Sequence, residues 1–306
     1  MRGFIKNFYE NTTIGNFLIF PAKKLYDIYR FQIISEKRLI TRTFIRRLGY
    51  KPNLEDPKTF NEKIQWLKLN DKNPSNSLYA DKFAVRTFIK EMIGEKYLIP
   101  LVYHTDNPAD IINENIPDFP CIIKTNHGSS GGIIVRDKSK VNWKNVRKKL
   151  STSMKNNYYY GSKEWQYKDI KPRILVEKLL LDANSNIPND YKFHCFNGKV
   201  EFIQVDIDRY KVHKRNLYDT NWKFFDFRLW REHGDPTEKP NALNEMISIA
   251  ERLGANFQYI RVDLYNLGSE VYFGELTFHP GSGFDSFKPV KWDRVFGDKL
   301  QLENLK

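Results

Sequence analysis

The sequence predicts an α+β protein, in which helices and antiparallel strands are separate kinds of element. Apolar residues recur every three to four positions in segments such as 56–71 and 243–253, whereas several short runs alternate apolar and polar residues as strands do. The chain has 306 residues, of which 41% are hydrophobic and 15% aromatic. This length and composition suffice for one large domain or two to three small ones with a buried core.

The expected elements follow one another without an internal repeat. We expect helices at 56–71, 80–93, 142–154 and 243–253. Strands are expected at 97–102, on both sides of a glycine-rich turn within 121–135, and at 173–180, 190–196 and 199–210. The last strands should form a hairpin within 259–284 that turns at residues 266–269.

Positive charge is concentrated at the N-terminal end. The formal net charge is +13, and residues 1–47 carry ten Lys and Arg against three acidic residues, which leaves +6 for the rest of the chain. Aromatic residues such as Phe17, Phe20 and Tyr29 lie among these charges. The pattern is typical of a pair of amphipathic helices that either packs on the domain or lies on the anionic inner face of a membrane. The segment lacks a recognisable nucleic-acid module, so we expect no nucleic-acid partner.

The cysteines and the apolar runs bear on the compartment. Cys121 and Cys195 lie in separate apolar runs without metal-binding spacing, so a disulfide framework is not expected. The uncharged stretch 11–22 is too short and too polar to cross a bilayer, and no signal-peptide cleavage pattern follows it. These features favour a cytoplasmic protein.

Two carboxylates mark the predicted hairpin as a candidate metal site. Asp263 and Glu275 lie on its two arms. Because side chains alternate along a strand, both can reach one face, with Arg261 and Thr277 on the same side. Mg²⁺ is commonly held by one or two carboxylates together with nucleotide phosphates. The other interpretation is an ordinary hairpin with a solvated polar face.

A glycine-rich segment is a candidate phosphate site. Lys124 ends an apolar strand just before TNHGSSGG. Glycines let the backbone approach a ligand, successive N–H groups in such a turn bind anions, and a nearby lysine suits phosphate. The spacing matches neither the Walker nor the Rossmann pattern. A turn without a ligand explains this segment, taken alone, about as well.

Two further strands carry candidate nucleotide contacts. Glu177 ends the strand in ILVEKLL, where a carboxylate and the following backbone can meet the exocyclic amine and the edge of adenine. Lys192, in the aromatic strand DYKFHCF, can reach the same cleft. The simpler interpretations are a surface glutamate and a lysine whose stem is buried while its amine reaches water.

The order of these segments resembles the ATP-grasp fold of D-alanine:D-alanine ligase and related carboxylate–amine ligases. The family's hinge resembles Val176 to Leu180, its Arg-Ile-Asp strand resembles Arg261 to Asp263, and its metal-binding end resembles Glu275 to Thr277 with Pro280-Gly281. Thr277 stands where the superfamily usually has Asn. The segments TFNEKIQWLKL, ADKFAVR, IKTNHGSSGG, DYKFHCFNGK and FGELTFHPGSGF, over about residues 50–290, are similar to the TupA-like ATP-grasp family.

The resemblance implies an architecture and an activity. Two α+β subdomains would enclose ATP, at 121–189 and 190–306, preceded by a basic helical extension at 1–48 and an N-terminal domain on the substrate side at 49–120. The implied reaction uses ATP and Mg²⁺ to form an amide through an acyl phosphate. It would join an amine or amino acid to a uronic-acid sugar or a surface polysaccharide of the capsule, O-antigen or teichuronopeptide type.

The resemblance also implies roles for single residues. Arg261 and Lys192 would act in catalysis, and Asp263, Glu275 and, as a further candidate, Thr277 would hold the metal. The residues implied to bind ATP are Lys124, Gly128, Ser129, Ser130, Gly131, Gly132, Glu177, Lys178, Leu179, Leu180 and Lys192.

Recognition of the substrate needs other residues. A cationic patch suits an acidic substrate, although a solvated loop is the other interpretation. The candidates are Arg209, His213, Arg215, Asn216, His279, Gly281 and Ser282. The alternative function is a metal-dependent glycosyltransferase that uses Asp206 and Asp208 as a D-x-D motif, and a third is a membrane-attached scaffold. The glycosyltransferase interpretation leaves Lys124, ILVEKLL and the hairpin unexplained, and only the basic N-terminal region favours the scaffold.

Overall fold

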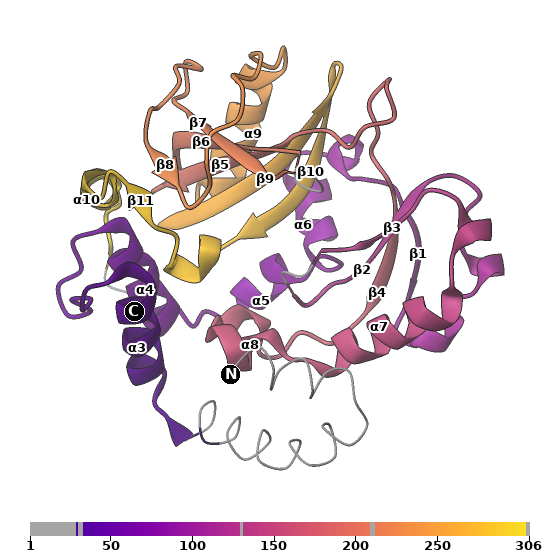
Figure 1. Ribbon diagram of the computed structural model, residues 1–306, viewed down its shortest axis with the longest axis horizontal. Coiled ribbons are helices and arrows are strands. Elements are labelled where there is room, and N and C mark those ends of the chain that lie inside the picture. Colours follow the sequence, from indigo (N-terminus) through magenta and orange to yellow (C-terminus); the bar gives the residue numbers. More distant parts are fainter. Residues whose placement is uncertain (1–28, 30–32, 129–130, 209–211, 304–306) are drawn as a thin grey trace. The chain divides into compact units, whose positions relative to one another are not determined.

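The computed structural model describes residues 29, 33–128, 131–208 and 212–303 (Figure 1). The chain has two parts, Met1–Lys51 and Pro52–Lys306, and each is described by itself. In the first part, α3 (Glu36–Leu48) begins at Ser35, whose side chain accepts the N–H of Arg38, and ends at Gly49 with φ 85°. Most of the predicted basic extension lies outside the described residues.

Three helices open the second part. They are α4 (Phe60–Asn70), α5 (Ser75–Ala80) and α6 (Val85–Met92), followed by the 3₁₀ turn η2 (Glu95–Tyr97). α4 starts with a capping box, in which Thr59 accepts the N–H of Glu62 and the Glu62 carboxylate accepts the N–H of Thr59. The helix predicted for 80–93 starts only at Val85, because Asp81 Oδ1 accepts the N–H groups of Phe83 and Ala84 and forms a turn.

The first sheet has four antiparallel strands in the order β1-β4-β2-β3. They are β1 (Leu101–Thr105), β2 (Cys121–Thr125), β3 (Ile133–Val135) and β4 (Ile174–Lys178). α7 (Trp143–Lys155), capped by Asn142 as predicted, packs on this sheet over a shared apolar core. The strand predicted for 97–102 starts later, because 95–97 is a turn and Pro100 has no N–H for a ladder. The sheet draws on both predicted ranges, 49–120 and 121–189.

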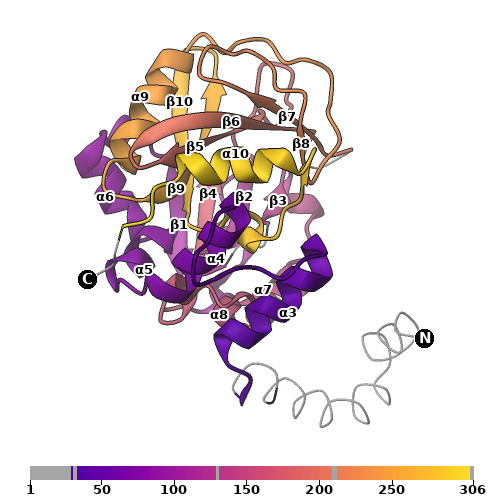
Figure 2. The same cartoon turned by 90° about the vertical axis from the view of Figure 1, so that its left-hand side faces the viewer.

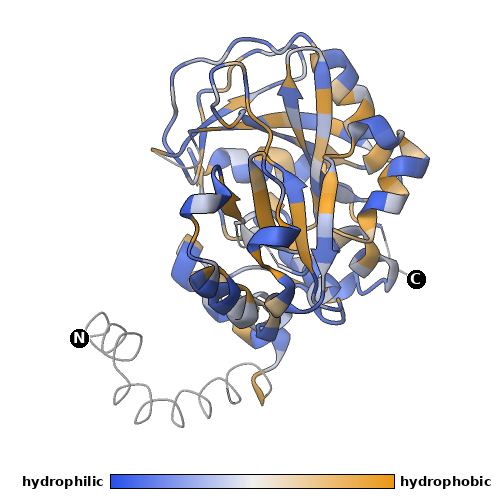
Figure 3. Ribbon diagram, turned by 90° about the vertical axis from the view of Figure 1, so that its right-hand side faces the viewer, coloured by the Kyte–Doolittle hydropathy of each residue, from blue (hydrophilic) through white to orange (hydrophobic). Residues whose placement is uncertain are grey.

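The second sheet has five antiparallel strands in the order β10-β9-β5-β6-β7. They are β5 (Asp190–Phe196), β6 (Lys199–Ile207), β7 (Lys214–Tyr218), β9 (Tyr259–Leu267) and β10 (Glu270–Thr277). Because side chains alternate along its strands, this sheet has two different faces, and Figure 3 shows hydrophobic and hydrophilic residues mixed along the strands of the protein. Phe193, Ile203 and Val262 form a core with α9 (Leu243–Gly254) on one face. The other face carries the charged side chains.

The remaining elements surround an aromatic core. β8 (Arg228–Leu229) pairs with β11 (Phe287–Lys288), and the turn η7 (Pro280–Gly283) connects β10 to β11. α10 (Lys291–Lys299) lies beside α4 (Figure 2), and Phe60 and Phe296 belong to their common core. α8 and the short turns complete the described elements: η3 (Pro108–Asp110), η4 (Asn113–Asn115), η5 (Lys138–Lys140), α8 (Tyr158–Ser162) and η6 (Trp165–Tyr167).

Two expectations about the whole chain can be compared with this fold. Cys121 and Cys195 are both buried and free, as expected for a chain without a disulfide framework. Among the described residues, no helix combines the length and the apolar character that crossing a membrane requires.

Candidate active site

The β9–β10 hairpin brings the predicted carboxylates together. Asp263 and Glu275 are direct partners across the hairpin, and so are Arg261 and Thr277. Directly opposed residues in an antiparallel pair point to the same face. The register shifts between Phe273 and Glu275, so the ladder has an irregularity just before Glu275. The predicted convergence of the two carboxylates on one face is therefore confirmed.

Cations hold Asp263 from two sides. Arg261 binds it with two nitrogens, Nε at 2.6 Å from Oδ1 and Nη2 at 2.7 Å from Oδ2. Lys192, its partner on β5, donates from Nζ to Asp263 Oδ2 at 2.7 Å and also to Asp190. Arg261 Nη2 donates to Thr277 Oγ1 at 3.0 Å and lies 3.6 Å from Glu275 Oε1. Lys192 and Arg261 are thus fixed parts of one buried charge network.

The electrostatics of this face keep Arg261 charged. Burial works against the guanidinium charge, but Asp263, followed by Glu275, outweighs it and holds the pKa of Arg261 above its usual value. His194, the partner of Arg261 on β5, is buried as well. Burial, followed by the charge of Arg261, holds the pKa of His194 well below its usual value. The imidazole is therefore neutral beside the charged network.

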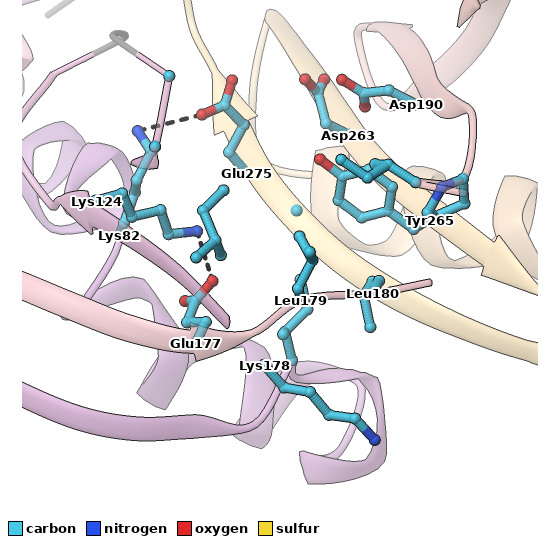
Figure 4. A pocket seen from close by; sticks show the side chains of 17 residues that line it. Lys82, Lys124, Glu177, Lys178, Leu179, Leu180, Asp190, Asp263, Tyr265 and Glu275 are labelled. Carbon is cyan, nitrogen blue, oxygen red and sulfur yellow. Dashed lines mark ion pairs between the residues drawn. The ribbon is translucent and has the colours of Figure 1, made fainter. Parts of the chain in front are cut away.

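A cavity lies against this face of the sheet (Figure 4). Glu275, Asp263 and Tyr265 of the hairpin line it on one side, and Lys124, Glu177 and the glycines after β2 line it on the other. Its lining comes from both sheets and contains most of the described residues that were predicted to bind ATP: Lys124, Gly131, Gly132, Glu177, Lys178, Leu179 and Leu180. Residues that were predicted from distant segments of the sequence therefore line one cavity.

Ion pairs line the cavity, and one of them reaches the hairpin. Lys124 Nζ lies 2.6 Å from Glu177 Oε2, and Arg86 Nη1 lies 3.6 Å from Glu177 Oε1. Lys82 Nζ lies 3.2 Å from Glu275 Oε2 and donates to the carbonyl of Gly128 at 2.8 Å. Lys82 thus links the glycine-rich segment to the hairpin, and both Lys82 and Lys124 line the cavity, where they can also meet phosphate oxygens.

Lys82 and Arg86 were missed as site residues by the sequence analysis. Lys82 reaches the cavity because its N–H donates to Asn126 O, while Asn126 Nδ2 donates to Asp81 Oδ1 at 2.9 Å. These bonds fasten the turn before α6 to the start of the glycine-rich segment. Both residues belong to the segment ADKFAVR, which was used to identify the similar family but not to predict residues of the site.

The glycine-rich segment approaches the sheet closely. A Cβ on Gly132 would lie 2.4 Å from Ile122 Cγ1, so only glycine fits without displacing that side chain. Gly131 and Gly132 line the cavity, and Gly128 meets Lys82 through its carbonyl. Ser129 and Ser130, also predicted to bind ATP, lie outside the described residues.

The hinge after β4 offers a backbone edge to the cavity. The N–H groups of Lys178 and Leu179 donate to Pro100 O and Pro120 O, both at 3.0 Å. The N–H of Leu180 has no acceptor among the described residues. Leu180 lines the cavity, so its N–H is the hinge donor available to a ligand there.

The predicted substrate residues fall into different surroundings. Arg215 is buried, and its Nε donates to Asp206 Oδ1 at 2.7 Å, while His213 Nε2 lies 3.3 Å from the same oxygen. Asn216 lies on the other face of β7, where its Nδ2 donates to Asp235 O at 2.7 Å. Arg209 lies outside the described residues. The expected patch therefore does not present Arg215 and Asn216 side by side as free groups.

His279, Gly281 and Ser282 lie at the end of β10. Gln166 Nε2 lies 3.2 Å from His279 Nδ1, and burial lowers the pKa of His279 despite the nearby Glu164. Ser282 is bound by the buried Lys68 of α4, whose Nζ donates to its carbonyl at 2.6 Å and to its hydroxyl at 2.8 Å. Lys68 was not among the predicted site residues.

Lys68 should make stability depend on pH in the alkaline range. Burial lowers its pKa from 10.5 to about 8, and Glu164 offsets only part of this. Between these values the unfolded chain binds more protons at this residue, so the free energy of unfolding rises with pH there and falls again toward pH 8. We expect urea unfolding to show that the difference between wild type and Lys68→Met changes by about 3 kcal/mol across this window. Parallel pH curves would contradict the lowered pKa.

The paired carboxylates fit a magnesium ion. Asp263 and Glu275 both line the cavity, and the ammonium group of Lys82 already lies beside Glu275. In the part of the chain that the structure describes, no group of three or more His, Cys, Asp and Glu side chains is placed to hold a metal. Two carboxylates, completed by phosphates and water, are a usual donor set for Mg²⁺. Thr277 Oγ1 accepts from Arg261 and lies 3.4 Å from Glu275 Oε1.

Comparisons with known proteins agree with the predicted family. The TupA-like ATPgrasp family matches residues 62–301. The chain is similar to D-alanine–D-alanine ligase from Bacillus anthracis, with 16% identity, coverage of 86% of this chain and 90% of that one, and a TM-score of 0.47. It is also similar to the ATP-grasp ligase PsnB complexed with a minimal precursor, with 11% identity, coverage of 68% and 54%, and a TM-score of 0.37. The chain thus spans about half of the PsnB chain, and no curated protein matches.

The family match includes every part of the site. It spans most of α4, the glycine-rich segment, the hinge after β4 and the β9–β10 hairpin. The α+β fold, with two antiparallel sheets whose residues line one cavity, agrees with the predicted ATP-grasp fold. The chain therefore belongs to the TupA-like ATP-grasp family.

Proposed function

We propose that this protein is an ATP-dependent ligase, which uses Mg²⁺ and ATP to activate the carboxylate of an acidic sugar or polysaccharide and joins it to an amine. The observation that carries the proposal is the meeting of Asp263, Glu275, Lys124 and the hinge residue Leu180 at one cavity. Similarity to the TupA-like family supports a polysaccharide substrate. The net charge of +13 supports an acidic one, because a cationic protein concentrates anions near its surface.

In the proposed complex, different residues contact the adenine and the phosphates of ATP. Leu180 N–H and the Glu177 carboxylate meet the adenine edge, and the apolar side chains of the hinge cover the ring. Lys124 and Lys82 exchange their carboxylate partners for phosphate oxygens, while Gly131 and Gly132 allow the backbone close to them. When bound at Asp263 and Glu275, Mg²⁺ neutralises charge that develops on the phosphates.

The reaction has two steps. An oxygen of the substrate carboxylate attacks the γ-phosphorus, the bond to the bridging oxygen breaks, and ADP leaves with that electron pair. The amine then attacks the acyl carbon of the acyl phosphate, inorganic phosphate leaves, and the amine nitrogen loses a proton. Negative charge builds up beside Arg261 in both steps, and its buried guanidinium is already fixed by Asp263.

The glycosyltransferase alternative has weaker support. Asp206 is buried, and burial alone would raise its pKa, but hydrogen bonding from His213 and the charge of Arg215 hold the pKa well below its usual value. The Asp206 carboxylate is therefore already bound by His213 and Arg215. A D-x-D metal site would need to take Asp206 away from both partners.

Nucleotide preference tests the first half of the proposal. A ligand that binds only the folded protein raises its melting temperature by mass action. We expect a clear shift with ATP and Mg²⁺, a smaller one with GTP, and none with UDP-sugars. The measurement is differential scanning fluorimetry at equal nucleotide concentrations. A shift with UDP-sugars but none with ATP would favour the glycosyltransferase.

Release of ADP tests the second half. The purified protein is incubated with ATP, Mg²⁺ and pairs drawn from a panel of uronic acids, neutral sugars, amino acids and amines. The proposal expects ADP and phosphate only with a carboxylate, and a product whose mass equals that of the two substrates minus water. ADP release with neutral hydroxyl-bearing sugars alone would instead indicate a kinase.

A further inference from the structure

Glu177 of β4 carries a carboxylate that is almost fully buried in the wall of the cavity (Figure 4). The residue is only 3% exposed. A buried charge is costly unless a charge of opposite sign pairs with it. Among the described residues, the ion pairs of Glu177 are to two cations, Lys124 and Arg86. These two cations differ in how they are held.

The Lys124 side chain is held by Glu177 alone. Its Nζ lies 2.6 Å from Glu177 Oε2, and it makes no second ion pair or side-chain hydrogen bond in the described part of the chain. Lys124 lines the cavity, and the flexible stem of a lysine can carry its ammonium group to another anion. The phosphates of a nucleotide in the cavity would therefore compete with Glu177 for this ammonium group.

The Arg86 side chain is fixed at two places. Its Nη1 lies 3.6 Å from Glu177 Oε1, and its Nη2 donates to the carbonyl oxygen of Ile99 at 3.0 Å. Ile99 is buried and lines the cavity, whereas Arg86 is not among the described residues that line it. Arg86 therefore approaches Glu177 from α6 and leaves the cavity to Lys124.

This arrangement decides which cation can leave Glu177. When Lys124 moves to a phosphate, Glu177 loses the nearer of its two cations. A buried carboxylate without any cation is strongly unfavourable, so Lys124 can move only if another positive charge stays behind. Arg86 can stay, because its second bond, to the Ile99 carbonyl, holds it outside the cavity.

We propose that Arg86 is a positioning residue that acts as the permanent counter-ion of Glu177 and thereby releases Lys124 to bind the phosphates of ATP. The inference rests on the proposed function, because it takes the phosphates to bind at Lys124 and the adenine to bind at Glu177. Arg86 itself contacts no part of the nucleotide. Its effect on ATP binding should therefore require both the phosphates and the charge of Glu177.

Variants of two cations on α6 test the inference. Arg86→Met removes the positive charge and keeps a long side chain. Lys90→Met is the matched control, because Lys90 lies one turn further along α6 and forms an exposed ion pair with Glu95 at 2.7 Å. Arg86→Gln is a second test variant in case Arg86→Met does not fold, since it is neutral but can still donate to the Ile99 carbonyl.

ATP with Mg²⁺ and adenosine are the probes, and titrations followed by two-dimensional NMR give both dissociation constants. We expect both Arg86 variants to bind ATP about 10- to 100-fold more weakly, because either Lys124 stays with Glu177 or Glu177 is left without a cation. Adenosine has no phosphates to draw Lys124 away, so its affinity should not change. Lys90→Met should bind both probes as the wild type does. Equal losses for ATP and adenosine would overturn the inference, because a merely distorted adenine site weakens both.

A double-mutant cycle with Glu177→Gln tests the role of the carboxylate charge. In Glu177→Gln the buried group is neutral, so Lys124 can leave it without any counter-ion. Adding Arg86→Met to Glu177→Gln should therefore weaken ATP binding no further, whereas the same change in the wild type does. A full loss on the Glu177→Gln background would show that Arg86 does not act through Glu177.

The results also separate this inference from the proposed function. If the Arg86 variants weaken ATP but not adenosine, while no pair of substrates releases ADP, the proposed ligation fails and the counter-ion role stands. If the wild type releases ADP with a carboxylate but the Arg86 variants bind ATP as tightly as the wild type, only the counter-ion role fails. If the wild type binds no ATP, both fail, because no phosphate then competes for Lys124.

Discussion

Replacing Glu275 by glutamine should abolish ATP turnover while the protein stays folded. The amide keeps the size of the side chain but removes the charge that faces Asp263 across the hairpin and lines the cavity. A site left with one carboxylate binds Mg²⁺ poorly, and losing one electrostatic contact to the reacting phosphate typically costs on the order of 10²- to 10³-fold in rate. We expect ADP release to fall at least that far.

The fold should tolerate this change. The Glu275 side chain is 32% exposed, and its pairing with Lys82 at 3.2 Å is that of a partly exposed ion pair, which contributes about 1 kcal/mol or less. Glu270→Gln is the matched control, since Glu270 lies at the exposed start of the same strand. Equal turnover in wild type and Glu275→Gln, or equal losses in both variants, would remove Glu275 from the metal site.

Where site residues lie close together in the sequence, the sequence alone predicted their arrangement. Asp263 and Glu275 belong to one hairpin with a short turn, so the alternation of side chains alone places them on one face. The cap of α7 by Asn142 is equally local. In such cases the relevant geometry is set within a few residues, and no knowledge of the rest of the fold is needed.

The residues that were missed depend on contacts between distant segments. Lys82 lies in a short turn between two helices, and only the bonds of that turn to Asn126, 45 residues from Asp81, bring it to the cavity. Asn61, Gln65 and Lys68 look like the solvated face of an amphipathic helix. They are buried because the turn after β10 supplies carbonyl acceptors, which no sequence pattern of α4 reveals.

The number of basic residues in a segment also failed to predict which charges are free to meet a substrate. Arg215 lies in a basic stretch and suggested a free cationic patch. On the sheet it faces Asp206 of the neighbouring strand, and Asp285 approaches it from beyond the turn. Ion pairs between strands depend on register, so the sum of charges in one segment does not give the charge that a substrate meets.

Replacing Arg261 by alanine should lower turnover by about 10²- to 10³-fold, or about 3 to 4 kcal/mol of transition-state stabilisation. Nε and Nη2 of Arg261 are held by Asp263, and Nη2 also by Thr277. Nη1 has no acceptor among the described residues, so it is the nitrogen available to the developing charge. The KM for ATP should change little, because the hinge and the lysines bind the nucleotide elsewhere in the cavity.

The loss of Arg261 must be separated from a loss of folding. Asp263 is buried, and removing one partner of a buried ion pair costs about 3 to 5 kcal/mol, although Lys192 still pairs with it. Turnover is therefore measured well below the melting temperature of each variant, with Arg252→Ala on the exposed side of α9 as the control.

Arg261→Lys decides between charge and geometry. A lysine keeps the positive charge but has no planar fork, so it can bind Asp263 or face the substrate, but not both. We expect it to recover stability toward the wild-type value and to leave turnover low. Full recovery of turnover would mean that charge alone suffices. If Arg261→Ala instead kept near-normal turnover and lost ATP binding, Arg261 would be a nucleotide anchor, and the group that stabilises the acyl phosphate would have to be sought among Lys192 and the turn at Gly281.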